Sequence, residues 1–267
     1  MIASVLRLEL RRSRSLLGWL TATMVLYTLF MTLYYPTIKA NQATLDAMIR
    51  MWPKEMLAAF NMQGNLTDVG TFYNVYVFMM IWPIVAAIAG ILLATRTVAA
   101  DLDRGFLELP LAGRISRPAY LATSIAGQAI GMAVLVAATI ATILLSGPVI
   151  GESWDAGRFA VAGLVAFAFG CAIAAVTTLL AVATLSRGLA GGAVAALLIA
   201  MYLLQALAQI DPNLDRLRYA SVFRYADTAP LLNVGTFPAE GLLVLGVVSI
   251  ACWLAAVWAF RRRDLLA

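Results

Sequence analysis

Residues 159–185 read FAVAGLVAFAFGCAIAAVTTLLAVATL, a run that contains no aspartate, glutamate, lysine or arginine. About 20 mainly apolar residues in a helix cross the roughly 30 Å hydrocarbon core of a bilayer. Comparable uncharged runs occur at residues 16–35, 73–95, 119–145, 189–210 and 241–260. The sequence therefore predicts an all-α integral membrane protein, in which residues 1–267 form a single transmembrane domain of six helices.

The composition excludes several other classes of protein. Hydrophobic residues make up 63% of the chain and charged residues 12%, whereas soluble domains have about 45–50% apolar and 25% charged residues. Histidine is absent, and Cys171 and Cys252 lie in separate apolar runs. This composition disfavours haem sites, histidine-based zinc sites and disulfide frameworks. We expect no cofactor in this chain.

The basic residues predict the orientation of the helices. Of the 19 lysines and arginines, 12 fall on the side that also carries both termini. Basic residues are enriched in cytoplasmic segments of membrane proteins, so both termini are predicted to be cytoplasmic. The net charge of +5 is explained by attraction to anionic membrane lipid and indicates no nucleic-acid partner.

Four segments outside the spans suggest additional structure. Residues 1–15 have arginines on one helical face and apolar residues on another, which predicts an amphipathic helix in the membrane plane. Residues 36–72 are too long for a simple connection and predict a helical cap on the outer surface. Residues 221–225 and 229–234 are apolar enough for a re-entrant segment, with a surface loop as the alternative.

The segment 96–118 is the most informative connection, because it mixes apolar and charged residues on the predicted cytoplasmic side. A simple connector needs only a few residues. We therefore expect a cytoplasmic helix at this position that contacts a soluble partner, in preference to a helix that contacts only lipid headgroups.

The spans offer no energy source of their own. Charged residues and histidine inside a membrane mark proton relays and ion coupling, and the six predicted spans contain no aspartate, glutamate, lysine, arginine or histidine. A phosphate-binding loop needs a lysine after glycine, but the two lysines, Lys39 and Lys54, follow isoleucine and proline. Any energy for transport is therefore expected from another polypeptide.

Three polar residues of the fifth span, Tyr202, Gln205 and Gln209, share one helical face. This face is a candidate substrate pathway or dimer seam. Hydrogen bonding between helices, worth about 0.6 kcal/mol on average, explains the same residues equally well.

The chain resembles the membrane subunit of ABC-2 type ABC transporters, the permeases of many bacterial exporters. Three motifs carry this resemblance. In the 96–118 segment the matching residues are Asp101, Asp103, Arg104, Gly105, Leu107, Glu108, Leu109, Ser116 and Arg117. Before the last span they are Ser221, Phe223 and Tyr225, and at the end of the chain Phe260 to Asp264.

This resemblance implies a permease in the bacterial plasma membrane that exports a hydrophobic or amphipathic substrate and is not itself an enzyme. A cytoplasmic ATP-binding subunit would hydrolyse Mg-ATP, and a second permease subunit would complete a homodimer or heterodimer. The expected contacts with the ATP-binding subunit are Asp101, Asp103, Arg104, Gly105 and Glu108. A membrane scaffold that recruits a soluble protein and a stand-alone secondary transporter are the alternatives.

Overall fold

The computed structural model describes residues 2–53, 56–57, 65–96, 116–210 and 212–262. This part of the chain is all-α and contains six helical segments long and apolar enough to cross a membrane. The six segments are α1 (Ile2–Ala40), the combination of α4 (Val69–Tyr73), η1 (Asn74–Ile81) and α5 (Trp82–Thr95), α8 (Arg117–Ser146), α9 (Ala156–Thr184), α10 (Arg187–Ile210) and α13 (Ala239–Arg262). Each predicted span coincides with one of them, so the predicted fold class is confirmed.

The structure corrects the prediction for the first 15 residues. They do not form a separate helix in the membrane plane but continue into the first span as one 39-residue helix, α1, about 58 Å long at 1.5 Å per residue. No proline or glycine precedes Gly18, so nothing interrupts the helical hydrogen bonds. Glu9 and Ser13 are buried, so one face of this segment packs against the bundle.

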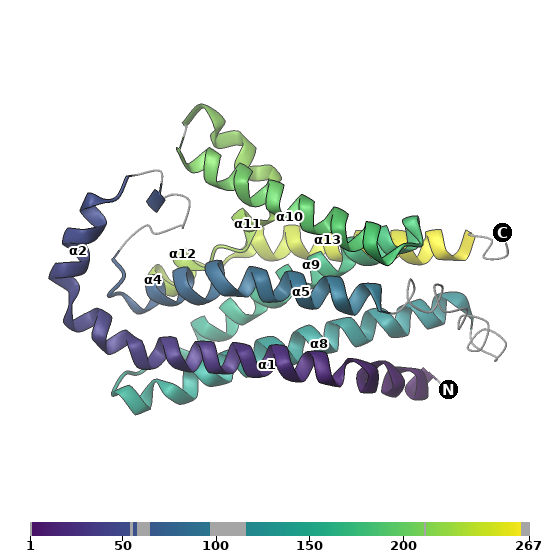
Figure 1. The fold of residues 1–267 in the computed structure, drawn as a ribbon, viewed down its shortest axis with the longest axis horizontal. Coiled ribbons are helices and arrows are strands. Elements are labelled where there is room, and N and C mark those ends of the chain that lie inside the picture. Colours follow the sequence, from purple (N-terminus) through teal and green to yellow (C-terminus); the bar gives the residue numbers. More distant parts are fainter. Residues whose placement is uncertain (1, 54–55, 58–64, 97–115, 211, 263–267) are drawn as a thin grey trace.

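Helix α9 is the centre of the bundle and packs against α13, α5, α8 and α10. Its many alanines and glycines allow these neighbours to approach closely. Helix α1 packs mainly on α8. As Figure 1 shows, α1 begins and α13 ends at the same end of the bundle, here called the terminal end. An even number of crossings brings both termini to the same side. The cytoplasmic location of the terminal end stays a prediction.

At the opposite end, the described part of the predicted cap is mainly helical. The first span extends through Pro36 to Ala40, and α2 (Gln42–Met51) follows it. Residues 54–55 and 58–64 of the predicted cap lie outside the described residues.

The segment before the last span folds back into the bundle. The 3-10 helix η3 (Pro212–Ala220) runs back along α10, and two short helices, α11 (Val222–Tyr225) and α12 (Ala229–Val234), follow it. Phe223, Leu231 and Leu232 of these helices are buried. The segment, called the re-entrant segment below, therefore packs on the bundle through these side chains, and its entry into the membrane stays a prediction.

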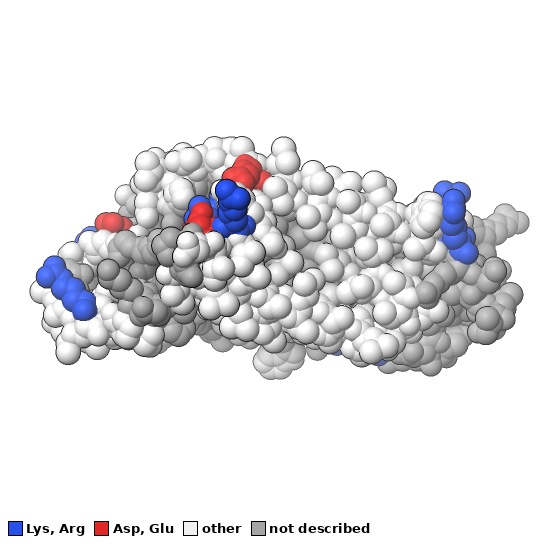
Figure 2. Space-filling model, turned by 90° about the horizontal axis from the view of Figure 1, so that it is seen from above, with Lys and Arg blue, Asp and Glu red and all other residues white. Residues whose placement is uncertain are grey.

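Charged side chains gather toward the two ends of the molecule, and the broad band between them is largely uncharged on the face shown in Figure 2. The opposite end carries several ion pairs, among them Lys39 with Glu152 at 2.6 Å and Arg218 with Asp215 at 3.0 Å. This distribution is what a bundle surrounded by lipid requires, because hydrocarbon solvates charge poorly.

Candidate functional site

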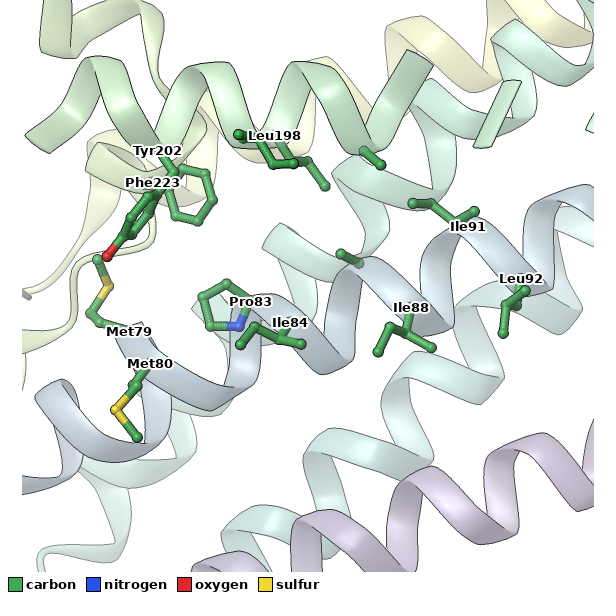
Figure 3. Close-up of a pocket in the computed structure, with 13 residues that line it drawn as sticks. Met79, Met80, Pro83, Ile84, Ile88, Ile91, Leu92, Leu198, Tyr202 and Phe223 are labelled. Carbon is green, nitrogen blue, oxygen red and sulfur yellow. The ribbon is translucent and has the colours of Figure 1, made fainter. Parts of the chain in front are cut away.

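The main candidate site is an apolar groove between α5 and α10, here called the α5–α10 groove. Its volume is about 730 Å³, within the range of cavities that hold drug-sized ligands. Its lining residues are Met79, Met80, Pro83, Ile84, Ala87, Ile88, Ile91, Leu92, Ala195, Leu198, Ile199, Tyr202 and Phe223. Figure 3 shows the two helices as facing walls, with none of the labelled side chains charged.

The two walls follow from helical periodicity. On α5, Ile84 and Ile88 are one turn apart and point into the groove, and on α10 Ala195, Leu198 and Tyr202 lie on one face. Ile84 is 55% exposed and Ile88 42% exposed. The groove is therefore open on one side in the single chain.

One end of the groove is shaped by an unusual backbone. The segment η1 is a π-helix of eight residues, and Met79 and Met80 project from it. Short π-helical segments are rare and often occur at functional sites. The α-helical pattern resumes at Trp82 with Pro83 in its first turn, where proline supplies no N–H to the turn of η1 before it. The Trp82 indole donates a hydrogen bond of 3.1 Å to the Ala166 carbonyl and so fixes this junction to α9.

The re-entrant segment closes the same end of the groove. The Phe223 ring of α11 lies 5.6 Å from the Tyr202 ring and 5.5 Å from the Phe169 ring, measured between centroids. Ser221 donates a hydrogen bond of 3.0 Å to the Met201 carbonyl. The Tyr202 hydroxyl is directed toward Met79 in Figure 3. This end therefore combines aromatic, thioether and hydroxyl groups, whereas the rest is aliphatic.

Buried polar contacts hold the re-entrant segment on the second span. Asn74 is 1% exposed, and its Oδ1 accepts hydrogen bonds from the Thr228 N–H at 3.0 Å and the Thr228 hydroxyl at 2.8 Å. Asn233 donates to Thr71 at 2.9 Å. These contacts fix α12 against α4 and the first turn of η1.

Asp227 lies next to this network and is the one described titratable group outside the spans whose pKa departs clearly from its ordinary value. Burial raises its pKa, because desolvation disfavours the charged form. Hydrogen bonds from the Ala229 N–H and Asn74 and the charge of Arg224 oppose this effect without cancelling it.

Comparison with known protein families shows to which family the chain belongs. The model of the family described as "Multidrug efflux system permease Rv1217c, C-terminal domain" matches residues 2–261. The chain belongs to this family. A comparison with curated proteins found no match. The chain is thus a multi-pass membrane protein of a permease family that serves efflux, and the α5–α10 groove is the natural candidate for its substrate site.

The three polar residues predicted to share one face of α10 differ in their surroundings in this permease. Tyr202 lines the α5–α10 groove, but Gln205 and Gln209 do not. The Oε1 atoms of both glutamines are buried and have no hydrogen-bond partner in the described part of the chain. Hydrogen bonding between helices was the alternative explanation for these polar residues. Among the described residues, these two oxygens have no partner that would support it.

The predicted contacts with an ATP-binding subunit, Asp101, Asp103, Arg104, Gly105 and Glu108, lie outside the described residues of the permease. The helices that flank them, α5 and α8, have their adjoining ends at the terminal end of the bundle (Figure 1). The segment 96–118 thus joins two helices on the side that carries the ends of α1 and α13.

Several groove residues were not identified from the sequence. Ile84, Ile88 and Ile91 were treated as ordinary span residues, although their spacing places two of them on one face of the second span. The signal that points to a site is the combination of proline, two preceding methionines and this isoleucine face within one span. No sequence pattern shows that Phe223 of the re-entrant segment reaches Tyr202.

Proposed function

We propose that the chain is the membrane subunit of an ATP-driven ABC-2 type exporter in the bacterial plasma membrane. Its substrates are hydrophobic or amphipathic molecules that enter the α5–α10 groove from the lipid. The observation that carries this proposal is a drug-sized groove with partly exposed, uncharged walls in a chain that belongs to a multidrug efflux permease family.

The proposed energy source is Mg-ATP hydrolysed on a cytoplasmic ATP-binding subunit. The chain has only two lysines and no phosphate-binding loop of the Walker type. We propose that Asp101, Asp103, Arg104, Gly105 and Glu108 contact this subunit. A shape change of the subunit would move α5 and α8 as rigid bodies, since the contact segment joins them directly.

We further propose that a second permease unit, the same chain or a different one, completes the pathway. Helices α10 and α13 expose many large apolar side chains, including Leu203, Leu207, Leu243 and Leu254. The family is named for the C-terminal domain of a permease, so in that protein the unit occupies the C-terminal part of a chain.

The proposal is tested by co-purifying the chain with an ATP-binding protein encoded beside it and measuring ATP hydrolysis with and without a lipophilic substrate. The variants Gly105→Val and Glu108→Lys should abolish stimulation by substrate while membrane insertion stays normal. Glu240→Lys, an acid at the opposite end, is the matched control and should retain stimulation. Full stimulation in both loop variants would contradict the proposal.

A stand-alone secondary transporter is the second candidate, because the structure buries an acid that the sequence placed outside the spans. Glu9 is 8% exposed, within a helix that crosses the bundle, and buried acids often serve ion coupling. Efflux from vesicles driven by an ion gradient in the absence of ATP would favour this candidate over the ATP-driven one.

A further inference from the structure

The α5–α10 groove has two chemically different parts, and the difference bears on which substrates it binds. At the end next to the re-entrant segment, the lining consists of the thioethers of Met79 and Met80 and the rings of Tyr202 and Phe223 (Figure 3). The remaining lining is aliphatic, with alanine, leucine, isoleucine and one proline. None of the described lining residues is charged. A substrate therefore meets aromatic and sulfur groups at one end only.

Three aromatic rings lead from the core of the bundle to the groove. Phe169 of α9 is 0% exposed, Phe223 of α11 is 5% exposed and Tyr202 of α10 is 39% exposed. The ring centroids of neighbouring members are 5.5 and 5.6 Å apart, and their planes are inclined by 57° and 73°. Aromatic rings prefer such tilted contacts to a face-to-face sandwich. The series ends in a partly exposed ring, so an aromatic ring of a ligand would extend it by one member.

The surrounding structure holds these rings in place. Phe169 belongs to α9, the helix on which the other spans pack. The Ser221 hydroxyl donates a hydrogen bond of 3.0 Å to the Met201 carbonyl, which fixes α11 beside Tyr202. Binding costs less when the contacting groups are already ordered. The aromatic end of the groove is thus a preorganised contact surface.

Met79 and Met80 add an adaptable surface beside the exposed ring. Both belong to the π-helix η1 and line the groove, and Met80 is 42% exposed. The thioether sulfur makes favourable contacts with the edges of aromatic rings, and the unbranched methionine side chain adjusts to different shapes. Isoleucine, which forms much of the other lining, lacks the sulfur and is stiff at χ1. This end therefore suits aromatic rings of more than one size.

We infer that the groove selects lipophilic substrates that carry a planar aromatic ring. The ring lies against Tyr202, Met79 and Met80, and the aliphatic part of the substrate extends along Ile84 and Ile88 toward the terminal end. A saturated molecule of the same size fills the groove but makes no contacts between rings, so it binds more weakly. This inference rests on the proposed function, because it concerns the substrate of the same groove.

The test compares two uncharged competitors that differ in aromaticity, a long-chain alcohol that ends in a naphthalene ring and its decahydronaphthalene counterpart. The purified full chain is held in lipid nanodiscs with a lipophilic fluorescent probe, and each competitor is used to displace the probe. Concentrations are corrected for the measured partition of each compound into the lipid. The naphthalene compound should bind about three- to tenfold more tightly, because an aromatic contact adds this much beyond the burial of apolar area.

Variants locate the bound ring. Tyr202→Leu removes the exposed ring and should bring the ratio of the two affinities close to one. Tyr202→Phe keeps the ring and should retain the ratio, and Met79→Leu should lower it by less than Tyr202→Leu does. Tyr34→Leu is the matched control, because Tyr34 of α1 has a similar exposure of 43% and does not line the groove. It should retain the wild-type ratio.

The wild-type comparison decides the inference even where a variant fails to fold. Equal affinity of the wild type for the two competitors would overturn it and leave the groove as a site for lipophilic substrates in general. Failure of both competitors to displace the bound probe would overturn the proposed substrate site together with this inference. A wild-type ratio that persists in Tyr202→Leu would place the ring elsewhere and would also overturn it.

Discussion

Helices α9 and α10 are consecutive spans of similar apolar character, yet they occupy opposite environments. In their most apolar stretches, 72% of the α9 residues are buried inside the protein, but only 11% of those of α10. Both helices are rich in alanine and glycine, so composition does not account for the difference. Helix α9 is surrounded by α5, α8, α10 and α13, whereas α10 exposes large residues such as Leu203 and Leu207.

We call α9 the scaffold helix, because the other helices pack around it, and α10 the wall helix, because one of its sides lines the groove. The scaffold helix α9 holds the η1–α5 junction through the Trp82–Ala166 hydrogen bond. The wall helix α10 tilts away from the bundle toward the opposite end (Figure 1), and the α5–α10 groove lies on one of its sides. A change in α9 should therefore affect stability, and a change on the groove side of α10 should affect substrate binding.

The largest expected effect is on stability, from a matched pair of glycine substitutions. A Cβ atom at Gly163 of α9 would lie 2.9 Å from the Ile140 Cγ1, whereas one at Gly192 of α10 meets nothing within 4 Å. Gly163→Leu should lower the free energy of unfolding by about 1–3 kcal/mol through overpacking. Gly192→Leu should change it by less than about 0.5 kcal/mol. Melting temperatures in detergent measure both, and equal losses would contradict the assignment of scaffold and wall.

The next effect is on substrate binding. Ala195 lines the groove, and Ala195→Trp should fill part of it and weaken binding of a lipophilic fluorescent substrate about tenfold, or about 1.4 kcal/mol. Leu26→Trp is the control, since Leu26 of α1 is 66% exposed and does not line the groove. Equal binding by the two variants would show that substrate does not occupy this groove.

The same contrast explains what the sequence could predict. The number and extent of the spans follow from the uncharged runs, because a membrane excludes charge from every helix in the same way. The α9 and α10 runs are alike by this criterion, at mean hydropathies of 2.4 and 2.0. Which of them is central depends on packing between distant residues, such as Gly163 with Ile140, and no local pattern encodes it.

The candidate site was predictable only in part for the same reason. Tyr202 was found because polar residues are rare in spans, and it does line the groove. Glu9 was assigned to a membrane-surface helix because arginines dominate its neighbourhood, and its burial depends on the closeness of Gly127 on another helix. The apolar walls of the groove are indistinguishable in sequence from lipid-facing residues.

A smaller effect tests the polar face of α10. The buried Oε1 atoms of Gln205 and Gln209 find no partner among the described residues, so Gln205→Leu and Gln209→Leu should raise the stability of the isolated chain by roughly 1 kcal/mol each. Transport by the assembled permease should fall, if a second permease unit or a substrate supplies the missing donors. Gln128→Leu is the control and should be destabilising, because Gln128 bonds Thr178. Loss of stability in the α10 variants would show partners within the chain.

The smallest effect concerns pH and the re-entrant segment that closes the groove. The pKa of Asp227 is raised by burial in the folded protein from an ordinary value of about 3.9. Between these two values the folded state binds more protons than the unfolded state, so this residue makes stability fall as pH rises through that window. Asp227→Asn removes the titration, and the asparagine oxygen can still accept the Ala229 N–H bond that Asp227 accepts at 3.0 Å.

The melting temperature of Asp227→Asn should therefore exceed that of wild type at neutral pH, and the difference should shrink as pH is lowered toward 4. Asn233→Ala removes an uncharged contact of the same segment, the 2.9 Å bond to Thr71. It should lower the melting temperature by a similar amount at every pH. A difference between Asp227→Asn and wild type that does not vary with pH would mean that the Asp227 carboxylate stays solvated, and that the segment lies open to water at this end of the groove.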